Sequence, residues 1–449
     1  MAKCTTKSLD FASLGRKKVQ ADFAGGQLTS DAGSLLLREV DKRIGLIDAI
    51  NSCIPDPRDQ RYVQHSQRSM LAQRIMAIAL GYEDLNDHQT LRNDWLFQTA
   101  TERGIDPEEA LASTPTLWRL EERVSQESMV KIAEVFIDRW LKSYQQSPTQ
   151  IILDFDATDT PLYGQQEDRF FHGYYDCYCY LPLYVFCGDQ LLVPYLRPSK
   201  IDAAQHSRAI LKLLVDKIRR VFPDVQIIIR ADSGFCRYKM MRWCDRNGVY
   251  YILGIAKNPV LLEKAQPWTI PAKWHYERTE QKQRLFGGFS YAASTWDRQR
   301  RVIVKAEHSS HGENPRFVVT NLPGEEQFLY DQVYCQRGDM ENRIKEQQLY
   351  LFADRASCHG FLANQFRMIL SSAAYVLMET LRREGLKNTK MEKAQAHTIR
   401  NKLLKVAAVI QVSTRRIVFH LASGYPYKEL FVKLLSHLRR QPIPVFEFA

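Results

Sequence analysis

Residues 150–157, with the sequence QIILDFDA, decide the fold, because the pattern of the chain changes there from helical to extended. The stretch is rich in residues that favour strands, and side chains alternate between the two faces of a strand. Asp154 and Asp156 therefore share one face. An apolar strand that carries two carboxylates on one face is unusual, because burying a carboxylate is costly unless something positive compensates it.

The order of elements after this strand predicts an α/β sheet. Apolar runs at residues 181–187 and 190–196 indicate two further strands, joined by a turn. The sequence then predicts helices over 203–221 and 237–247 and strands over 225–231 and 249–256. Three strands, a helix, a strand, a helix and a strand form the order of a ribonuclease H-like fold, which we expect as a catalytic core.

The flanking regions have different compositions. Residues 1–148 read as mainly helical, with apolar residues at helical spacing. We interpret this region as DNA-binding, with a plain helical cap as the alternative. Residues 257–315 are rich in aromatic and basic residues and contain alternating runs, which predict a β-rich insertion. The core is expected to resume over 316–384, followed by a basic C-terminal region over 385–449.

Composition places the chain among ordinary globular proteins. Of 449 residues, 45% are hydrophobic and 25% are charged. No uninterrupted apolar run reaches the roughly 18 residues of a membrane span, and the N-terminal residues do not resemble a secretory signal. We expect a cytoplasmic protein without a membrane partner. The nine cysteines include no C-x-x-C pair, which argues against a zinc ribbon, and the spacing of Cys177, Cys179 and Cys187 gives little support for a metal site.

Positive charge is concentrated toward the C-terminal end. The chain carries a net charge of +11, and residues 379–440 hold 14 Lys or Arg against 4 Asp or Glu. Such an excess suits a polyanionic partner such as DNA, although a solvated helical surface would show it too. Charge alone leaves both interpretations open. Arg415 and Arg416, adjacent in this region, are our candidates for phosphate contacts.

Three acidic motifs stand out. Asp156 ends the first strand, and Asp232 follows the apolar strand 225–231, before a Ser-Gly turn. Glu341 lies on a predicted helix with Arg337 four residues earlier and Tyr334 seven residues earlier, a spacing that puts the three on one face. Two Mg²⁺ ions, for which Mn²⁺ can substitute, would compensate the three carboxylates and drive an in-line displacement at phosphorus.

Each motif also has a plainer interpretation. Aspartate favours turns, so Asp156 and Asp232 could merely end their strands. Glu341 and Arg337 could form a surface ion pair, which is common and weak. The three motifs together, in this order and on these elements, favour a shared catalytic and metal-binding site.

The motifs resemble those of a known family, the DDE transposases of bacterial insertion sequences, in the group with a Y-x2-R-x3-E signature and a β-rich insertion. The matching segments are DAT at 156–158, RADSGF at 230–235, FVVTNL at 317–322, the signature residues Tyr334, Arg337 and Glu341, and GYEDLNDH at 81–88. The resemblance extends over essentially the whole chain, and its combination of motifs is specific although no single motif is.

The resemblance implies a function in DNA transposition. A member of this family binds the terminal inverted repeats of a mobile element, cleaves the DNA there by metal-dependent hydrolysis and joins the 3′-hydroxyl ends to target DNA. It implies Asp156, Asp232 and Glu341 as catalytic residues and metal ligands, with Tyr334 and Arg337 on the DNA. It also implies a homodimer in the DNA complex and a nucleoid-associated location in the bacterial cytoplasm.

Two details of the family pattern need particular residues here. The family usually has a lysine seven residues after the glutamate, where this chain has Gln348, so Lys345 is the candidate for that phosphate contact. The family also has a tryptophan in the insertion that stacks on an unpaired base. Trp296 is our candidate, with Trp268 and Trp274 as alternatives, and core packing is the plainer role for each.

Two other classes of protein remain as alternatives. A simple ribonuclease H-type nuclease would need the carboxylates but neither the long helical N-terminal region nor the insertion. A DNA-binding protein without enzymatic activity would need only the basic surface. A nicking assay with a variant of Asp156 separates the last class from the first two, because loss of the carboxylate would leave simple DNA binding intact.

Overall fold

The computed structural model describes residues 8–106 and 108–440, which form two compact units. The terminal unit combines residues 8–51, 56–120 and 380–440 from both ends of the chain, and the central unit contains residues 52–55 and 121–379. In the part of the chain that is described, no helix is long and apolar enough to cross a membrane.

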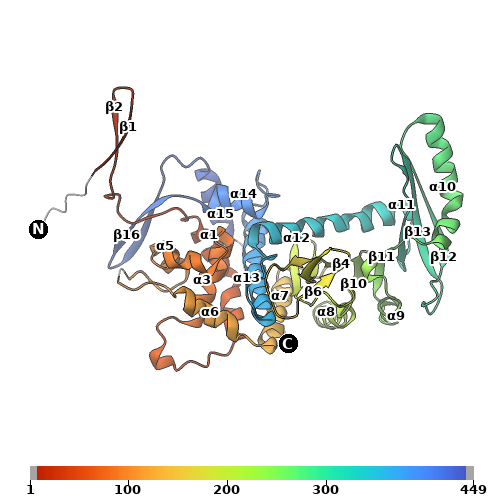
Figure 1. Cartoon of the computed structure of the whole chain (residues 1–449), viewed down its shortest axis with the longest axis horizontal. Helices are drawn as coiled ribbons and strands as arrows, with labels where there is room; N and C mark the ends of the chain where they lie inside the picture. The colour runs from red at the N-terminus through yellow and green to blue at the C-terminus, as the bar shows by residue number, and fades with distance from the viewer. Residues whose placement is uncertain (1–7, 107, 441–449) are drawn as a thin grey trace, which may run out of the picture. The chain divides into compact units, whose positions relative to one another are not determined.

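A sheet of nine strands forms the centre of the central unit (Figure 1). Its strands follow the order β12-β13-β15-β11-β10-β4-β8-β9, with β14 paired to β13. Their bounds are β4 Gln150–Ala157, β8 Leu183–Cys187, β9 Gln190–Tyr195, β10 Gln226–Ala231, β11 Tyr250–Ile255, β12 Gln283–Tyr291, β13 Arg300–Ser309, β14 Gly312–Glu313 and β15 Arg316–Thr320. Strands β4, β10 and β11 run parallel, and the other neighbours pair antiparallel. The predicted α/β sheet is therefore present, with every predicted strand in it.

Both faces of this sheet are covered. Ile227 and Ile229 of β10 belong to a core with residues of α7 (Gln126–Lys142), α8 (Ser207–Val221) and α9 (Tyr238–Arg246). Ile228, between them, packs on the other face with Leu329 and Tyr330. This period of two is the alternation expected of a strand. It also places Arg230, two residues after Ile228, on the second face.

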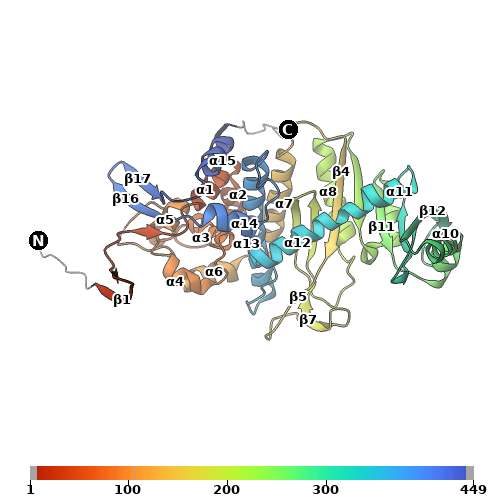
Figure 2. The same cartoon turned by 90° about the horizontal axis from the view of Figure 1, so that it is seen from above.

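The second face lies under the helical segment that follows β15. This segment begins at α11 (Glu326–Phe328), continues as a π-helical turn (Leu329–Tyr334) and a 3-10 turn (Cys335–Arg337), and becomes α12 (Gly338–Leu351). Figures 1 and 2 both show α12 running from the side of α11 toward α13 (Phe361–Thr380). The predicted helix is therefore interrupted by a π turn, a feature that is rare and often found at functional sites.

The insertion differs from the prediction in one respect. Residues 259–279 form a helix, α10 (Pro259–Thr279), and not strands. The Asn258 side chain caps the helix by accepting from the backbone N–H of Leu261, and a proline at the first turn is well tolerated. The internal prolines Pro267 and Pro271 concealed the helical pattern. The strands β12 to β14 extend the core sheet through β15 and do not form a separate sheet.

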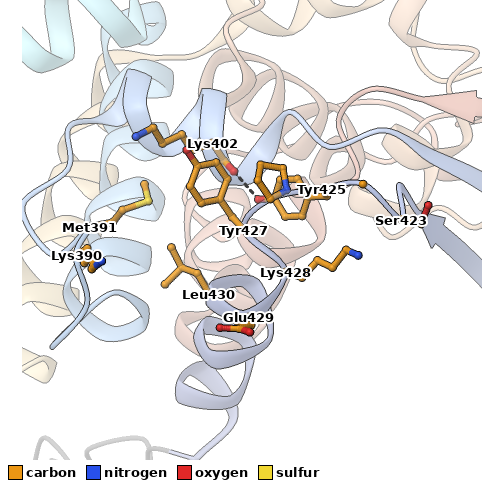
Figure 3. A pocket seen from close by; sticks show the side chains of 11 residues that line it. Lys390, Met391, Lys402, Ser423, Tyr425, Tyr427, Lys428, Glu429 and Leu430 are labelled. Atoms are coloured by element: carbon orange, nitrogen blue, oxygen red, sulfur yellow. Dashed lines mark hydrogen bonds between the residues drawn. The ribbon is translucent and has the colours of Figure 1, made fainter.

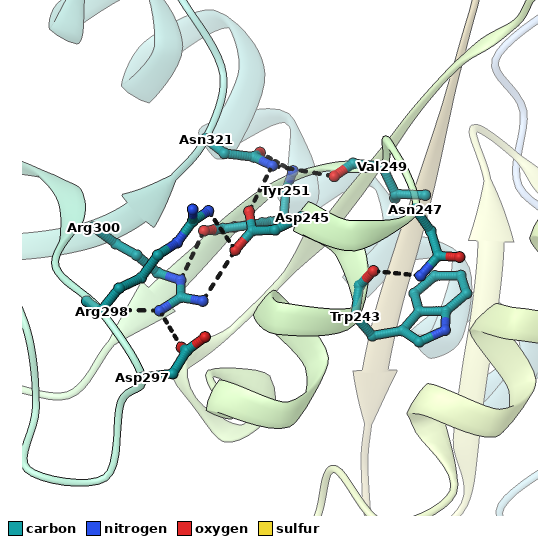
Figure 4. A network of polar contacts seen from close by, with 9 residues as sticks. All are labelled: Trp243, Asp245, Asn247, Val249, Tyr251, Asp297, Arg298, Arg300 and Asn321. Carbon is teal, nitrogen blue, oxygen red and sulfur yellow. Dashed lines mark hydrogen bonds and ion pairs between the residues drawn. The ribbon is translucent and has the colours of Figure 1, made fainter.

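A polar network joins the insertion to the core of the central unit (Figure 4). Asp245 of α9 accepts ion pairs from Arg298 at 2.7 Å and from Arg300 at 3.0 Å. The buried Arg300 guanidinium also donates to the Tyr251 hydroxyl of β11 at 3.1 Å. Asn321, after β15, donates to Asp245 at 3.3 Å. Both oxygens of the Asp245 carboxylate therefore have partners, and these contacts attach the insertion to the core.

A small sheet between β4 and β8 was not predicted. It consists of β5 (Thr160–Pro161), β6 (Phe170–His172) and β7 (Cys177–Tyr180), in the order β5-β7-β6. The strands are two to four residues long, which is too short for a hydrophobic alternation to show in the sequence.

The terminal unit is mainly helical and contains two small sheets. Its helices are α1 Ser34–Ile44, α2 Leu46–Ser52, α3 Gln67–Leu80, α4 His88–Leu91, α5 Trp95–Ala100, α6 Thr114–Arg123, α14 Ala396–Ile399 and α15 Lys428–Arg440, of which α2 and α6 lie largely within it. One sheet is the hairpin of β1 (Leu9–Leu14) and β2 (Lys17–Ala21). The other is β3 (Leu28–Thr29) with β16 (Ala408–Ser413) and β17 (Arg416–Leu421).

The C-terminal segment is an integral part of this unit. Strand β16 pairs with β3, with Ala408 opposite Thr29 and Val409 opposite Leu28. Helix α15 contacts α1, and the backbone N–H groups of Ala32 and Gly33 donate to carbonyls of Val406 and Leu404. The basic segment therefore does not fold as a separate body.

Candidate active site

The first two motifs lie at the carboxyl ends of neighbouring parallel strands. The register of β4 and β10 places Arg230 opposite Asp154 and Ala231 opposite Phe155. Asp232, the next residue, therefore comes level with Asp156, and adjacent strands are about 4.8 Å apart. The two aspartates occupy the same edge and the same face of the sheet.

Local hydrogen bonds hold both aspartates. Asp232 caps the 3-10 turn Ser233–Phe235 by accepting from the backbone N–H of Gly234 at 2.9 Å. Asp156 accepts from the backbone N–H of Ala157 at 3.0 Å. Each carboxylate keeps further lone pairs available, so the turn-capping role and a second role are compatible.

The third motif reaches Asp156 through Arg337. The Arg337 guanidinium lies 3.4 Å from Asp156 through Nη1 and 2.5 Å from Glu341 through Nη2. The side chains of Asp156 and Arg337 are largely buried, while that of Glu341 is 41% exposed. One guanidinium thus joins the strand and the helix that carry the first and third acidic motifs. The ion pair of Arg337 with Glu341 was expected as a plainer alternative, but it is not confined to the helix surface.

Tyr334 fits against a glycine of the sheet. A methyl group placed on Gly254 of β11 would lie 2.7 Å from the Tyr334 hydroxyl oxygen and 3.0 Å from the backbone nitrogen of Ser233. Only a residue without a side chain leaves this space. The Tyr334 hydroxyl therefore lies beside the segment that carries Asp232.

A buried ion pair between Asp154 and Arg230 connects the two strands that carry the aspartates with the helical segment that carries Tyr334. Arg230 donates to both carboxylate oxygens of Asp154, at 2.5 and 2.7 Å, and its Nη1 donates to the carbonyl of Val333 at 2.5 Å. Both side chains are almost fully buried. The guanidinium thus joins β4, β10 and the π-helical turn that ends at Tyr334. Its fixed fork permits both the bidentate pair and the third bond.

The electrostatics of the site centre on Asp156. Burial raises the pKa of its carboxyl to about 7, with Asp232 and Glu341 adding to the rise and Arg337 opposing it. For Arg337, burial alone would lower the pKa, but Asp156 and Glu341 outweigh it, so the guanidinium stays charged. Burial raises the pKa of Tyr334, which keeps its hydroxyl a proton donor at neutral pH. The site therefore carries more carboxylate than its own cation compensates.

The donor set has the chemistry of a magnesium site. Mg²⁺ prefers a few carboxylate oxygens and water, and needs neither histidine nor cysteine. Burial, with the nearby Asp232 and Glu341 adding to it, raises the pKa of Asp156, and a bound divalent cation would stabilise the charged form of this carboxyl. As the side chains of residues 8–106 and 108–440 lie here, no three acidic, histidine or cysteine side chains come close enough to hold one ion. Arg337 occupies the space between Asp156 and Glu341.

The remaining candidates on α12 take different positions. Lys345 is exposed. Gln348, which stands where the family has lysine, donates to the backbone carbonyl of Asp159 at 3.2 Å. Asp159 follows β4, so Gln348 fastens the helix to the loop after the first motif. The residue at this position thus makes a protein contact here.

The three tryptophans differ in exposure. Trp296 is half-buried, packs edge-on against Tyr291 and has the Arg300 guanidinium 5.7 Å from its ring. Trp268 of α10 fills the space above Gly287, where a methyl group would lie 1.9 Å from the ring. Trp274 is 50% exposed, with Arg278 at 4.3 Å from its ring. Packing explains Trp268, and Trp274 is the most accessible of the three.

Arg415 and Arg416 lie at the tip of the β16–β17 hairpin in the terminal unit. Both are exposed, Arg415 in the turn and Arg416 as the first residue of β17. Neither residue therefore contributes to the core of the terminal unit.

Two residues at the site were not singled out in the sequence. Arg230 stands in the motif RADSGF directly before the aspartate, and a charged residue inside an apolar strand is a signal for a buried ion pair. Gly254 interrupts an otherwise apolar strand, which often marks a close approach of another group. The sequence contains both signals. It does not show that Arg230 contacts Asp154 and Val333 or that Gly254 contacts Tyr334, because these contacts follow from the fold.

Comparison with known proteins identifies the family of the chain. A family model described as transposase DDE domain group 1 matches residues 11–443. The chain therefore belongs to the DDE transposase family. A search of curated proteins found no match.

Among solved structures, one match is the cryo-EM structure of the piggyBac transposase synaptic complex with hairpin DNA. It is 12% identical, covers 84% of this chain and 80% of its own, and has a TM-score of 0.40.

Proposed function

We propose that this transposase binds the terminal inverted repeats of a mobile DNA element, cleaves the DNA there and joins the 3′-hydroxyl ends to target DNA. The observation that carries the proposal is the joint placement of the three motifs. Arg337 contacts both Asp156 and Glu341, and Asp232 lies level with Asp156 on the next strand. Asp156, Asp232 and Glu341 are the proposed catalytic residues.

The strand order supports a ribonuclease H-like core. The segment β9-β8-β4-β10-β11 has the first strand in the middle, the second antiparallel to it and the fourth and fifth parallel. We propose that the core comprises residues 149–256 and 316–384, with 257–315 as the insertion. Residues 1–148 and the basic region 385–449 are the proposed DNA-binding regions, and they share a compact unit over much of their length.

Asp156, Asp232 and Glu341 would hold Mg²⁺, or Mn²⁺ in its place. Such ions activate the attacking water or hydroxyl and stabilise the leaving oxygen when they are bound. Glu341 is exposed enough to turn away from Arg337 without disturbing the core. In that arrangement the bound ion, and not the Arg337 guanidinium, would compensate the charge of Asp156 and Glu341.

Arg337 and Tyr334 would bind the DNA strand. A guanidinium released from Asp156 and Glu341 can bind a phosphate oxygen with two parallel hydrogen bonds. Tyr334, fixed against Gly254, can donate to a neighbouring phosphate. The buried Asp154–Arg230 pair keeps both residues in register with the two aspartates through Val333.

Further DNA contacts are proposed for residues around the site and in the terminal unit. Lys345 lies exposed one turn after Glu341 on α12. Trp296 is the proposed stacking residue, although Trp274 is more exposed. Arg415 and Arg416 present charge at a hairpin tip. Two ends held together would need a homodimer in the DNA complex, and the bacterial nucleoid is the proposed location.

The decisive experiment uses a duplex that contains one end of the element and its flanking DNA. With Mg²⁺ or Mn²⁺, the wild-type protein should break the duplex at the end, and chelation should stop the reaction. Asp156→Asn, Asp232→Asn and Glu341→Gln should each abolish cleavage while they retain DNA binding. Asp339→Asn is the matched control, because Asp339 is an exposed carboxylate on the same helix and should be dispensable.

The other outcomes correspond to the other classes of protein. Cleavage at random positions, without preference for the end, would favour a simple nuclease. Binding without cleavage by the wild type, under every metal condition, would favour a DNA-binding protein. Retained cleavage in Asp156→Asn would contradict the assignment of the site.

A further inference from the structure

A hollow in the terminal unit is lined by lysines and tyrosines (Figure 3). It measures about 660 Å³ and lies between the end of the π-helical turn Arg400–Leu404, the loop before α15 and the first turn of that helix. Its charged and aromatic lining residues are Lys390, Lys402, Lys428, Glu429, Tyr425 and Tyr427. All of these residues belong to the terminal unit and are distant in sequence from the catalytic motifs.

The three lysines lack acidic partners. Lys390, Lys402 and Lys428 are exposed, and none forms an ion pair with another described residue. Other cations nearby are used within the protein: Lys405 pairs with Asp31 at 2.6 Å, and Arg400 donates to the carbonyl of Ala79 at 2.9 Å. The hollow therefore gathers three cations that form no ion pair within the described part of the chain.

The tyrosines that line the hollow are held in place by a hydrogen bond and by ring contacts. The Tyr425 hydroxyl donates to the backbone carbonyl of Lys402, and its ring meets Phe431 and Tyr427 edge-on, at 6.4 and 5.9 Å. The amino group of Lys402 lies 5.6 Å from the Tyr427 ring. A half-buried aromatic wall beside unpaired ammonium groups limits where those groups can move.

The segment that forms the hollow carries a large excess of positive charge. Residues 385–440 contain 12 Lys or Arg and 2 Asp or Glu. Glu429 is the one acidic residue of the lining, and it lies in the first turn of α15, where a negative charge favours the helix. An anion in this hollow would therefore meet three ammonium groups and one carboxylate.

We propose that this hollow binds the phosphate backbone of a DNA strand, through Lys390, Lys402 and Lys428 with Tyr427 packed beside the strand. Phosphates are the anions that DNA presents at regular spacing, and exposed lysines without partners bind them without internal competition. The proposal rests on the proposed function, to which it adds a DNA contact remote in sequence from the catalytic motifs. The site reads no base sequence, because lysine contacts to phosphate carry none.

The test measures binding of the full chain to a random-sequence duplex over a series of salt concentrations. The triple variant Lys390→Gln, Lys402→Gln and Lys428→Gln should bind about 10- to 100-fold more weakly, and its slope of log affinity against log salt should fall by about 2–3. The charge-matched control is Arg208→Gln, Lys212→Gln and Lys264→Gln, three exposed cations of the central unit. A second variant with arginine at the three pocket positions should bind like the wild type.

The outcomes separate this inference from the proposed function. Wild-type binding with equal losses in the pocket variant and the control would overturn the inference and leave the transposase proposal standing. Failure of the arginine variant to bind would also overturn it, provided that the thermal melts of all variants coincide. If the wild type binds no DNA at low salt, both proposals fall together.

Discussion

Cations are used in opposite ways near the carboxylates and in the C-terminal segment. In the central unit, Arg230, Arg300 and Arg337 are each fixed by carboxylates and lie largely buried. In residues 385–440, Lys390, Lys402, Lys428, Arg415 and Arg416 are exposed and have no described acidic partner. The same residue types thus set geometry in one region and offer charge in the other.

The net charge of a segment does not show which of its cations stabilise the fold. Even in the segment with the most positive charge, some cations such as Arg400 and Lys405 contribute to the fold, whereas these five remain exposed. A buried guanidinium without its partner is strongly destabilising, whereas an exposed one contributes little to folding. Substitutions in the two regions should therefore separate stability from DNA binding.

The largest effect is expected from breaking the Asp154–Arg230 pair. Arg230→Met leaves Asp154 buried without a partner and frees the carbonyl of Val333, which should cost about 3–5 kcal/mol in the free energy of unfolding. Denaturant unfolding measures this. Arg237→Met is the matched control, because its pair with Asp202 is about half exposed and should contribute less than about 1 kcal/mol. Equal losses in the two variants would remove the distinction between buried and exposed ion pairs.

A smaller effect on cleavage is expected at Arg337. Arg337→Ala should slow cleavage by about 10- to 150-fold, the equivalent of about 1.5–3 kcal/mol for charged hydrogen bonds. Arg337→Lys should recover only part of the rate, because lysine keeps the charge but loses the planar fork. Single-turnover cleavage rates give the comparison. A full rescue by lysine would show that charge alone matters at this position.

Asp156 should make stability depend on pH in the metal-free protein. Its folded pKa of about 7 exceeds the unfolded value, so the unfolded chain releases this proton first as the pH rises from about 4 to 7. Stability is lost over that window and stays lost above it. Asp156→Asn should therefore be more stable than the wild type by up to about 4 kcal/mol at pH 8 and equal to it near pH 4. Thermal melts of both proteins at both pH values, with a chelator present, measure this difference. Equal stability of Asp156→Asn and the wild type at pH 8 would contradict the prediction.

The smallest effect on stability is expected at Arg415 and Arg416. Replacing both by glutamine should change the free energy of unfolding by less than about 0.5 kcal/mol, because neither has a partner in the fold. DNA binding should nevertheless weaken, and its dependence on salt should become shallower. A binding curve identical to that of the wild type at all salt concentrations would exclude the hairpin tip from the DNA surface.

Much of the sheet could be predicted because its strands are buried and periodic. The runs at 150–157, 225–231 and 249–256 are short, apolar and rich in β-branched and aromatic residues, which favours strands, and Asp156 and Asp232 stand at the ends of the first two. The signature spacing also placed Arg337 and Glu341 on one face, which the structure confirms as an ion pair.

The remainder depended on contacts that sequence patterns do not contain. Prolines at 267 and 271 concealed α10, although the cap at Asn258 and Pro259 was a readable start. The strands β5 to β7 are too short for periodicity. The pairing of Asp154 with Arg230 needed the register of β4 and β10, and Gly254 has meaning only beside Tyr334.

The pairing of β3 with β16 has a consequence for synthesis of the chain. Residues 28–29 must wait for residues 408–413, which at about 5–20 residues per second emerge roughly 20–80 seconds later. During that time the α1 face that α15 covers is also without its partner. The terminal unit can therefore be completed only after the central unit has left the ribosome, so a chain that stops before α15 should be recognised by chaperones and proteases rather than released as a binding fragment.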